Sequence, residues 1–133
     1  MINKKYIIFF IFFLLPAFSQ AKYTRVFYYI ESKDARASFF AHPSSIDIFA
    51  PQTYALGDDG TLSGTLDDKL AKFAQNHNIK IMPLVTNAGF DKTSGHNILD
   101  DPAKQDTAIS ALILEAKDKK YWGWQFDFEQ MDA

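Results

Sequence analysis

Two acidic side chains near the end of this sequence have the spacing that acid–base chemistry needs. They stand in the stretch WGWQFDFEQ, where one residue separates Asp127 from Glu129. On a β-strand, successive side chains point to opposite faces, so Gln125, Asp127 and Glu129 would share one face. Neighbouring positions on that face are about 7 Å apart, and two carboxylates at this spacing repel each other in a poorly solvated site. We therefore expect one of them to hold a proton near neutral pH, as acid catalysis of glycosidic cleavage requires.

A solvated strand end is the alternative explanation for this Asp-x-Glu pair. Two features favour a functional role for this pair instead. The other face of the strand has Trp124, Phe126 and Phe128, which can pack under helices so that the polar face lies inside. The carboxylates also stand at the C-terminal end of the strand, where parallel α/β proteins have their sites. We interpret Asp127 and Glu129 as candidate catalytic residues.

The element that carries this pair is the last of four strand-like runs. The runs are residues 25–30, 46–54, 79–85 and 123–128. Three of them lack the alternation of apolar and polar residues that a sheet with one solvated face has, so we expect strands buried on both faces. All four are rich in the β-branched and aromatic residues that favour strands.

Helical patterns separate the runs. We expect a short helix around residues 34–41, and a second one capped by Thr65 with its apolar face over residues 66–77. The pair Asp101-Pro102 predicts the start of a third helix, which ends among the lysines of residues 117–120. Segments 57–60 and 87–89 are expected to open loops. Strands that alternate with helices predict a parallel sheet, so the fold class is α/β.

The last run resembles the fourth strand of the family 18 glycoside hydrolases. Their signature is DGxDxDxE, which Gly123, Asp127 and Glu129 match. Residues 26–29, 47–52 and 83–87 resemble the first three strands of that family. Residues 47–52 and 83–87 are similar to its bacterial cell-wall and spore-cortex branch in particular. The resemblance covers residues 23–131. It implies an incomplete TIM (β/α)8 barrel, of which this chain supplies the first four βα units.

Two positions depart from the signature. Trp122 stands where the family often has its first Asp, and Gln125 stands where it has another. The Gln125 amide has a supporting role in this interpretation, because it can hydrogen-bond Asp127 but cannot share its titration.

The resemblance implies retaining, substrate-assisted cleavage of glycans that carry N-acetyl groups, such as chitin oligosaccharides or peptidoglycan strands. Glu129 would protonate the glycosidic oxygen and later activate water, while the substrate's own acetamido carbonyl attacks the anomeric carbon. Asp127 would hold the acetamido N–H and stabilise the charged intermediate. No enzyme nucleophile and no cofactor are needed.

Further candidate substrate-binding residues follow from position. Tyr28 matches the family's first-strand tyrosine beside the cleaved sugar, with a place in the core as the equal alternative. Three more polar residues stand at strand ends and either bind sugar hydroxyls or make loop hydrogen bonds; they are Gln52, Tyr54 and Asn87. Either Trp122 or Trp124 could stack on a sugar ring. The three histidines are far apart in sequence, and we expect no metal site.

Composition excludes several other classes. The chain has 133 residues, a net charge of −2 and scattered Lys and Arg, which argues against nucleic-acid binding. There is no cysteine, so no disulfide framework exists. Lys4 and Lys5, the apolar run at residues 6–15 and a small-x-small site ending at Ala21 predict a signal peptide over residues 1–21. Residues 22–133 would then be secreted or periplasmic, with no membrane contact after cleavage; an uncleaved membrane anchor is the alternative.

A (β/α) barrel commonly has about 250 residues and eight strands, so we expect a truncated N-terminal half that is inactive alone. Its first and fourth strands would be exposed edges. The leading functional hypothesis is a hydrolase of β-1,4 linkages in N-acetylglucosamine-containing glycans. The alternative is a non-catalytic glycan-binding protein or decayed fragment on the same scaffold. A small open-sheet binding domain is a weaker third hypothesis, because no Gly-rich phosphate loop follows a strand.

Overall fold

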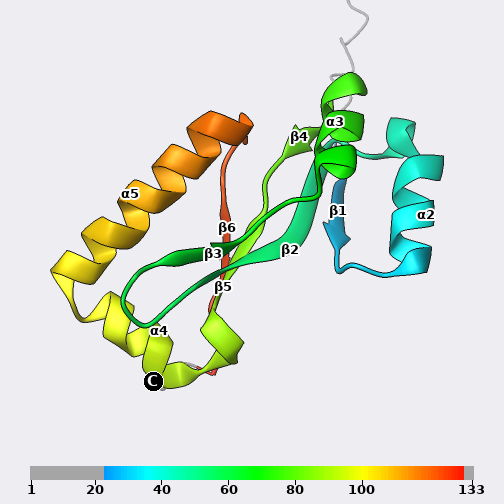
Figure 1. Ribbon diagram of the computed structural model, residues 1–133. Coiled ribbons are helices and arrows are strands. Elements are labelled where there is room, and N and C mark those ends of the chain that lie inside the picture. The colour runs from blue at the N-terminus through cyan, green and yellow to red at the C-terminus, as the bar shows by residue number, and fades with distance from the viewer. Residues whose placement is uncertain (1–22, 131–133) are drawn as a thin grey trace, which may run out of the picture.

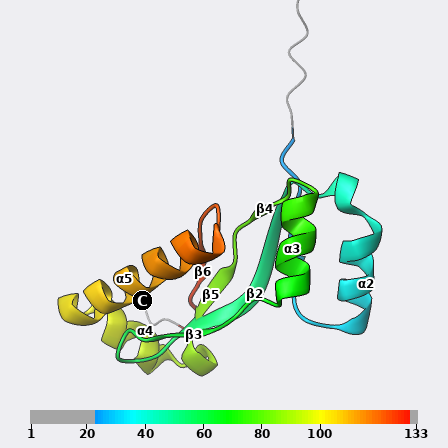
Figure 2. The same cartoon turned by 45° about the horizontal axis from the view of Figure 1, so that its top comes forward.

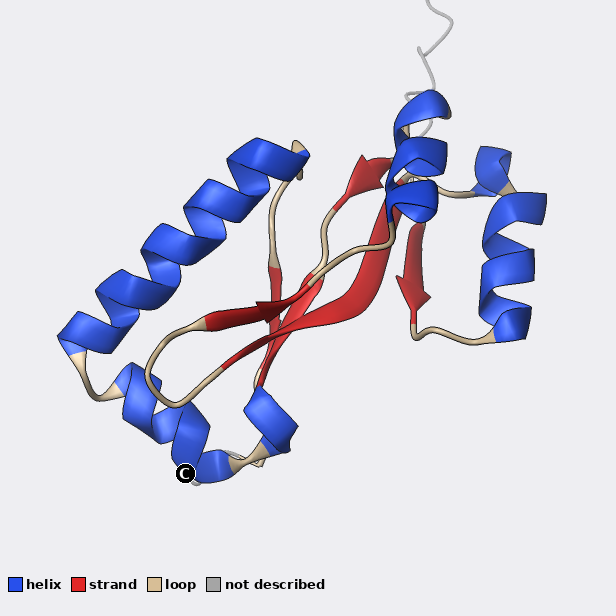
Figure 3. Cartoon of the chain, viewed as in Figure 1, coloured by secondary structure: helices blue, strands red, loops and turns tan. Residues whose placement is uncertain are grey.

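The computed structural model describes residues 23–130, so the expected signal peptide lies outside the described residues. Helices and strands alternate along the chain (Figures 1 and 3). In order they are β1 (Val26–Tyr29), α2 (Lys33–Ala41), η1 (Pro43–Ser45), β2 (Ile48–Leu56), β3 (Leu62–Gly64), α3 (Asp68–Asn76), β4 (Lys80–Ile81), β5 (Leu84–Asn87), η2 (Ala88–Phe90), α4 (Lys92–Leu99), α5 (Pro102–Lys119) and β6 (Gln125–Asp127).

The strands form a parallel sheet in the order β1, β2, β5, β6, with β4 also parallel to β2. Apart from the short strands β3 and β4, which both pair with β2, each strand pairs with the next one along the sequence, as in a (β/α) barrel. The predicted α/β class is confirmed, and the sheet with its helices forms a partial barrel. The described residues contain three βα units followed by a fourth strand, β6.

Four local features differ from the sequence prediction. The third run is divided into β4 and β5 around Pro83, which has no N–H to donate to a ladder. A short strand, β3, turns back against β2, and Gly64 at its end has a φ of +105°. Residues 92–99, beyond an expected loop, form α4. The cap of α3 is Asp67 rather than Thr65, because its carboxylate accepts the N–H groups of residues 69 and 70.

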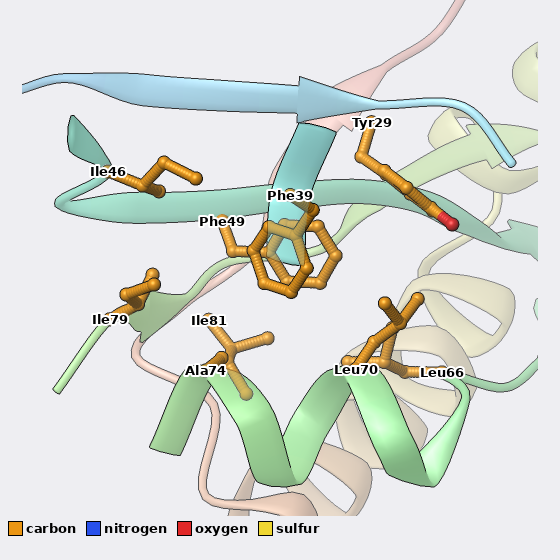
Figure 4. Packing of buried hydrophobic residues seen from close by; sticks show 9 residues of the cluster. All are labelled: Tyr29, Phe39, Ile46, Phe49, Leu66, Leu70, Ala74, Ile79 and Ile81. Atoms are coloured by element: carbon orange, nitrogen blue, oxygen red, sulfur yellow. The ribbon is translucent and has the colours of Figure 1, made fainter. Parts of the chain in front are cut away.

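The first hydrophobic cluster lies between the start of the sheet and helices α2 and α3 (Figures 2 and 4). Phe39 of α2 stacks on Phe49 of β2 with ring centroids 4.1 Å apart, and Tyr29 meets Phe49 edge-on at 5.3 Å. Leu70 and Ala74 cover the same patch from α3. Full burial of such side chains contributes roughly 1.5–3 kcal/mol each, which fixes these two helices on the sheet.

The second cluster lies between the later part of the sheet and helices α4 and α5. Tyr54, Val85, Ile98 and Leu112 are buried in it, so it joins β2 and β5 to both helices. Tyr121 packs against both clusters. Two apolar clusters thus cover the helix-facing side of the sheet, and the polar side chains of the other parity face away from them.

The change from one cluster to the other occurs within β2. The pairing of β2 with β5 shifts register between Gln52 and Tyr54, which marks a β-bulge. Because a bulge inserts one residue, side chains after it take the opposite parity. Gln52 therefore faces the inner side of the sheet, while Tyr54 faces the helices.

Candidate active site

Two rows of side chains cross the inner face of the sheet near the C-terminal ends of its strands. Strand register aligns Gln52, Leu84 and Gln125 in one row and Ala55, Thr86 and Asp127 in the next. Because partners in a parallel ladder point to the same face, Asp127 shares this surface with Gln52 and Gln125. The predicted inward orientation of Gln125 and Asp127 agrees with this register.

Tyr28 of β1 joins the same face from the other edge of the sheet. Its hydroxyl donates a hydrogen bond to Oε1 of Gln52 at 2.8 Å, and about half of its side chain is exposed. Burial, followed by the negative charges of Asp127 and Glu129, raises the pKa of the Tyr28 hydroxyl above its ordinary value. Both carboxylates therefore act on this hydroxyl through space, although β1 and β6 are at opposite edges of the sheet.

Glu129 lies two residues beyond the last residue of β6, so strand alternation does not determine its orientation. Glu129 is exposed, whereas Asp127 is half-buried. The backbone of Glu129 is held by Asn87, whose side chain accepts its N–H at 3.1 Å and donates to its carbonyl at 3.1 Å.

Gln125 makes its hydrogen bond away from the carboxylates. Its Nε2 donates to the backbone oxygen of Met82 at 3.1 Å. The amide therefore fixes β6 to the segment between β4 and β5, and this contact takes one of its two donors.

Tyr54, expected from the sequence among the substrate-binding residues, lies instead on the helix-covered side. Only 4% of it is exposed, and its hydroxyl donates to Glu115 of α5 at 2.7 Å and bonds the Tyr121 hydroxyl at 2.8 Å. The physical reason is the bulge after Gln52, which turns Tyr54 to the other face.

Asn87, the other strand-end residue expected to bind substrate, is fully buried. Its amide contacts backbone groups on two segments of the chain. Of the candidate residues, Tyr28 and Gln52 are hydrogen-bonded to each other and Asp127 shares their face of the sheet, while Asn87 binds the backbone of Glu129.

Neither tryptophan near the end of the chain lies on the inner face beside these residues. The indole N–H of Trp124 donates to the backbone oxygen of Leu112 at 3.1 Å, and its ring meets Tyr54 edge-on. Trp122 precedes β6, and the Lys80 ammonium lies 4.2 Å from its ring centroid. Trp124 is thus a core residue, and Trp122 belongs to the end of the sheet where the parallel strands begin.

A hollow of about 460 Å³ opens beside Gln52 on the inner face. Ala55 and Thr86 form its floor, and Ile30 and Phe90 contribute apolar walls from the loops after β1 and β5. Sequence reasoning missed Thr86, whose register partner is Asp127. Its position one residue before Asn87, at the end of an expected strand, was the available signal.

Within residues 23–130, no group of three or more His, Cys, Asp or Glu side chains is arranged to hold a metal ion. The described helices also include none with the length and apolar character needed to cross a membrane.

No protein-family model matches this sequence, and no curated protein does. Solved structures do match its fold. A chitinase from Chromobacterium violaceum superposes with a TM-score of 0.72 and 21% identity, covering 80% of this chain and 35% of its own. The spore cortex-lytic enzyme SleL from Bacillus cereus gives 0.70 and 20%, covering 82% and 28%. A chitinase from Bacteroides thetaiotaomicron gives 0.71 and 19%, covering 84% and 37%.

The likeness expected from the strand motifs is thus confirmed at the level of the fold. The chain shares the architecture of chitinases and a cortex-lytic enzyme, and it spans about a third of the length of these proteins.

Proposed function

We propose that this chain is part of a glycoside hydrolase that cleaves β-1,4 linkages in glycans containing N-acetylglucosamine. The observation that carries the proposal is the hydrogen bond between Tyr28 and Gln52 on the face of the sheet that Asp127 shares, with the charges of Asp127 and Glu129 both raising the pKa of Tyr28. Chitinases and a cortex-lytic enzyme share the fold, which supports a carbohydrate substrate for a site at this edge.

The proposed mechanism gives each side chain one task. Glu129 is exposed and so can reach a glycosidic oxygen, to which it donates its proton as the general acid. The substrate's acetamido oxygen attacks the anomeric carbon, and the bond to the leaving oxygen breaks. Asp127, pointing inward beside Thr86, accepts the acetamido N–H and balances the positive charge of the intermediate. Glu129 then takes a proton from the water that opens this intermediate.

Tyr28 serves as a neutral hydrogen-bond donor in this mechanism. A phenol with the ordinary pKa of 10.0 keeps its proton at neutral pH, and burial and the two carboxylates raise the pKa of this hydroxyl further. It is half exposed and already donates to Gln52, so a bound sugar can take over this hydrogen bond. We assign Tyr28 and Gln52 to substrate binding.

A second candidate is glycan binding without cleavage. The specific observation in its favour is Gln125, whose Nε2 donates to the backbone of Met82 and which supplies no acid next to Asp127. Asp127 then lacks the neighbouring carboxyl group that the family signature has at this position.

The test is hydrolysis of a chitin tetrasaccharide and of peptidoglycan strands by the complete hydrolase of which this chain is proposed to be part, compared with its Glu129→Gln variant. Because general acid catalysis contributes about 10²- to 10⁴-fold, we expect Glu129→Gln to lose activity by that factor and to retain glycan binding. Asp106→Asn, at an exposed position on α5, is the matched control and should cleave at the parent rate. Parent-like cleavage by Glu129→Gln would remove Glu129 from the mechanism.

Two further measurements separate the candidates. A de-N-acetylated tetrasaccharide should resist cleavage, because the substrate then lacks the attacking carbonyl. Binding of the acetylated tetrasaccharide with no turnover by the parent protein would favour the second candidate. Because peptidoglycan and chitin are met outside the cytoplasm, we also propose that residues 1–21 direct export. N-terminal sequencing of the exported protein should begin at Lys22.

A further inference from the structure

Among residues 23–130, Asn87 is the fully buried polar side chain at the C-terminal edge of the sheet. It ends β5, and none of its surface is exposed. Its Nδ2 donates to the backbone oxygen of Asp91 at 2.7 Å and to that of Glu129 at 3.1 Å. Its Oδ1 accepts the N–H of Glu129 at 3.1 Å. The side-chain amide of Asn87 therefore binds both the N–H and the carbonyl of Glu129, and also the carbonyl of Asp91.

This arrangement leaves Asn87 nothing to offer a ligand. A carboxamide has two N–H donors, and both are used on backbone carbonyls. Its burial keeps solvent and substrate from the remaining lone pair of the oxygen. Of the two roles that the sequence left open, these contacts support hydrogen bonding to loop backbone rather than to a sugar hydroxyl.

The other partner of Asn87, Asp91, connects Glu129 to helix α4. Asp91 is the N-cap of α4, and its side chain accepts the N–H of Ser94 at 3.0 Å. Helix α4 is anchored in turn by Ile98, which is buried with Leu112 of α5 in the second hydrophobic cluster. The contacts therefore run from Glu129 through Asn87 to the start of α4.

Glu129 has need of such an anchor. It lies beyond the last ladder position of β6, which ends at Asp127. The next residue, Gln130, has a φ of +58°, so the chain turns away from extended geometry at this point. A general acid must nevertheless be held close to its productive position, since a displacement of about 1 Å can cost about 100-fold in rate.

We propose that Asn87 is a positioning residue that fixes the backbone of Glu129 to the start of α4 and does not touch substrate. The role in positioning rests on the proposed function of Glu129 as the acid. The hydrogen bonds themselves can be tested without any assumption about activity.

The first experiment detects the contacts in the 133-residue chain by NMR. The side-chain amide hydrogens of Asn87 should exchange with solvent at least about 10-fold more slowly than those of Asn76 at the exposed end of α3. In Asn87→Asp, the carbonyl carbons of Asp91 and Glu129 should shift, because a carboxylate cannot donate to them. The control Asn76→Asp should leave both shifts unchanged. Equal exchange rates, or unmoved carbonyl shifts in Asn87→Asp, would overturn the contacts.

The second experiment measures kcat and KM over a range of pH in the complete hydrolase of which this chain is proposed to be part. Asn87→Asp should lower kcat by about 100-fold at neutral pH with little change in KM, since substrate contacts stay intact. The ratio of variant to parent kcat should rise as pH falls, because a protonated carboxyl regains one donor. A parent-like kcat at every pH, with Glu129→Gln inactive, would overturn the positioning role alone. A fully active Glu129→Gln would instead overturn the proposed function, while the NMR result still decides the contacts.

Discussion

Tyr29 is buried, whereas Val26 and Tyr28 on the same strand, β1, are about half exposed. It is fully buried, and its hydroxyl donates to Glu31 at 2.5 Å. Burial, together with the bond to Glu31 and its charge, raises the pKa of Tyr29 to about 12. Arg36 completes the group by binding Glu31 at 2.9 Å.

This raised pKa predicts a loss of stability at alkaline pH. A phenol that binds its proton more tightly when folded stabilises the protein below its ordinary pKa of 10.0, and this contribution is lost as pH rises through about 12. One such group contributes at most about 1.4 kcal/mol per pH unit. In Tyr29→Phe, the free energy of unfolding should therefore fall less steeply above pH 10, as urea titrations at several pH values would measure.

Part of the alkaline slope should survive in that variant. Burial also raises the pKa of Tyr54 and that of Tyr121, so these phenols keep contributing. At pH 7, Tyr29→Phe should cost about 1 kcal/mol through the lost hydrogen bond to Glu31. An unchanged slope above pH 10 would mean that the Tyr29 hydroxyl titrates alike in the folded and unfolded chain.

At the level of elements, the antiparallel pairing of β3 with β2 depends on a glycine. Gly64 has a φ of +105°, and a Cβ added there would lie 2.0 Å from the backbone oxygen of Thr53. The same strand segment of β2 contains the bulge that turns Tyr54 toward α5. A side chain at position 64 would therefore push apart the two strands next to the bulge.

Gly64→Ala should destabilise the protein by at least about 3 kcal/mol, because backbone strain adds to a steric clash. Gly89→Ala is the matched control. Gly89 also has a positive φ, +64°, but nothing lies within 4 Å of an added Cβ. Its cost should be only about 1–2 kcal/mol. Thermal unfolding followed by circular dichroism compares the two, and equal losses would mean that strain rather than crowding dominates at Gly64.

Local chemistry explains which elements the sequence predicts. Asp101 and Pro102 start α5 as expected, because the Asp101 side chain accepts the N–H of Ala103 at 2.9 Å and proline suits the first helical position. Strand β3 and the register shift in β2 were not predicted, because both depend on contacts between distant segments. Helix α4 was missed because Gly95 and the polar residues around it hide its apolar face.

In the candidate site, too, the features set by local sequence were predictable and those set by contacts between distant segments were not. Alternation along β6 predicted the inward orientation of Gln125 and Asp127, and the strand-end position predicted Gln52. Alternation failed for Tyr54, because a single inserted residue reverses parity. The buried contacts of Asn87 could not be read from its sequence position, since they join residues 42 positions apart.

For the whole molecule, the most prominent surface is apolar and lies along α5 and β6. Ile109, Ile113 and Phe126 are each about half exposed or more. Ile109 and Phe126, together with Phe128 and residues of α4, border a groove of about 360 Å³. At the other edge of the sheet, Val26 and Ile30 flank Tyr28 and are similarly exposed. Among residues 23–130, β1 and β6 each pair with one neighbour only.

These surfaces predict that the chain self-associates as its concentration rises. Ile109→Lys should lower the weight-average mass measured by light scattering, because it puts a charge in the apolar groove. Ser110→Lys, at the adjacent exposed position of α5, adds the same charge outside the groove and should leave association unchanged. An equal effect of both substitutions would point to net charge rather than to the groove.

The bulge in β2 also bears on how the chain loses its structure. Before the bulge, β2 belongs to the first hydrophobic cluster; after it, the same strand belongs to the second. Apart from this strand, Tyr121 is the described side chain that packs against both clusters. Regions joined by so few contacts commonly open as separate cooperative units. Residues 52–54 therefore mark a boundary at which the α4–α5 region can unfold while α2 and α3 stay packed, and the candidate site spans that boundary.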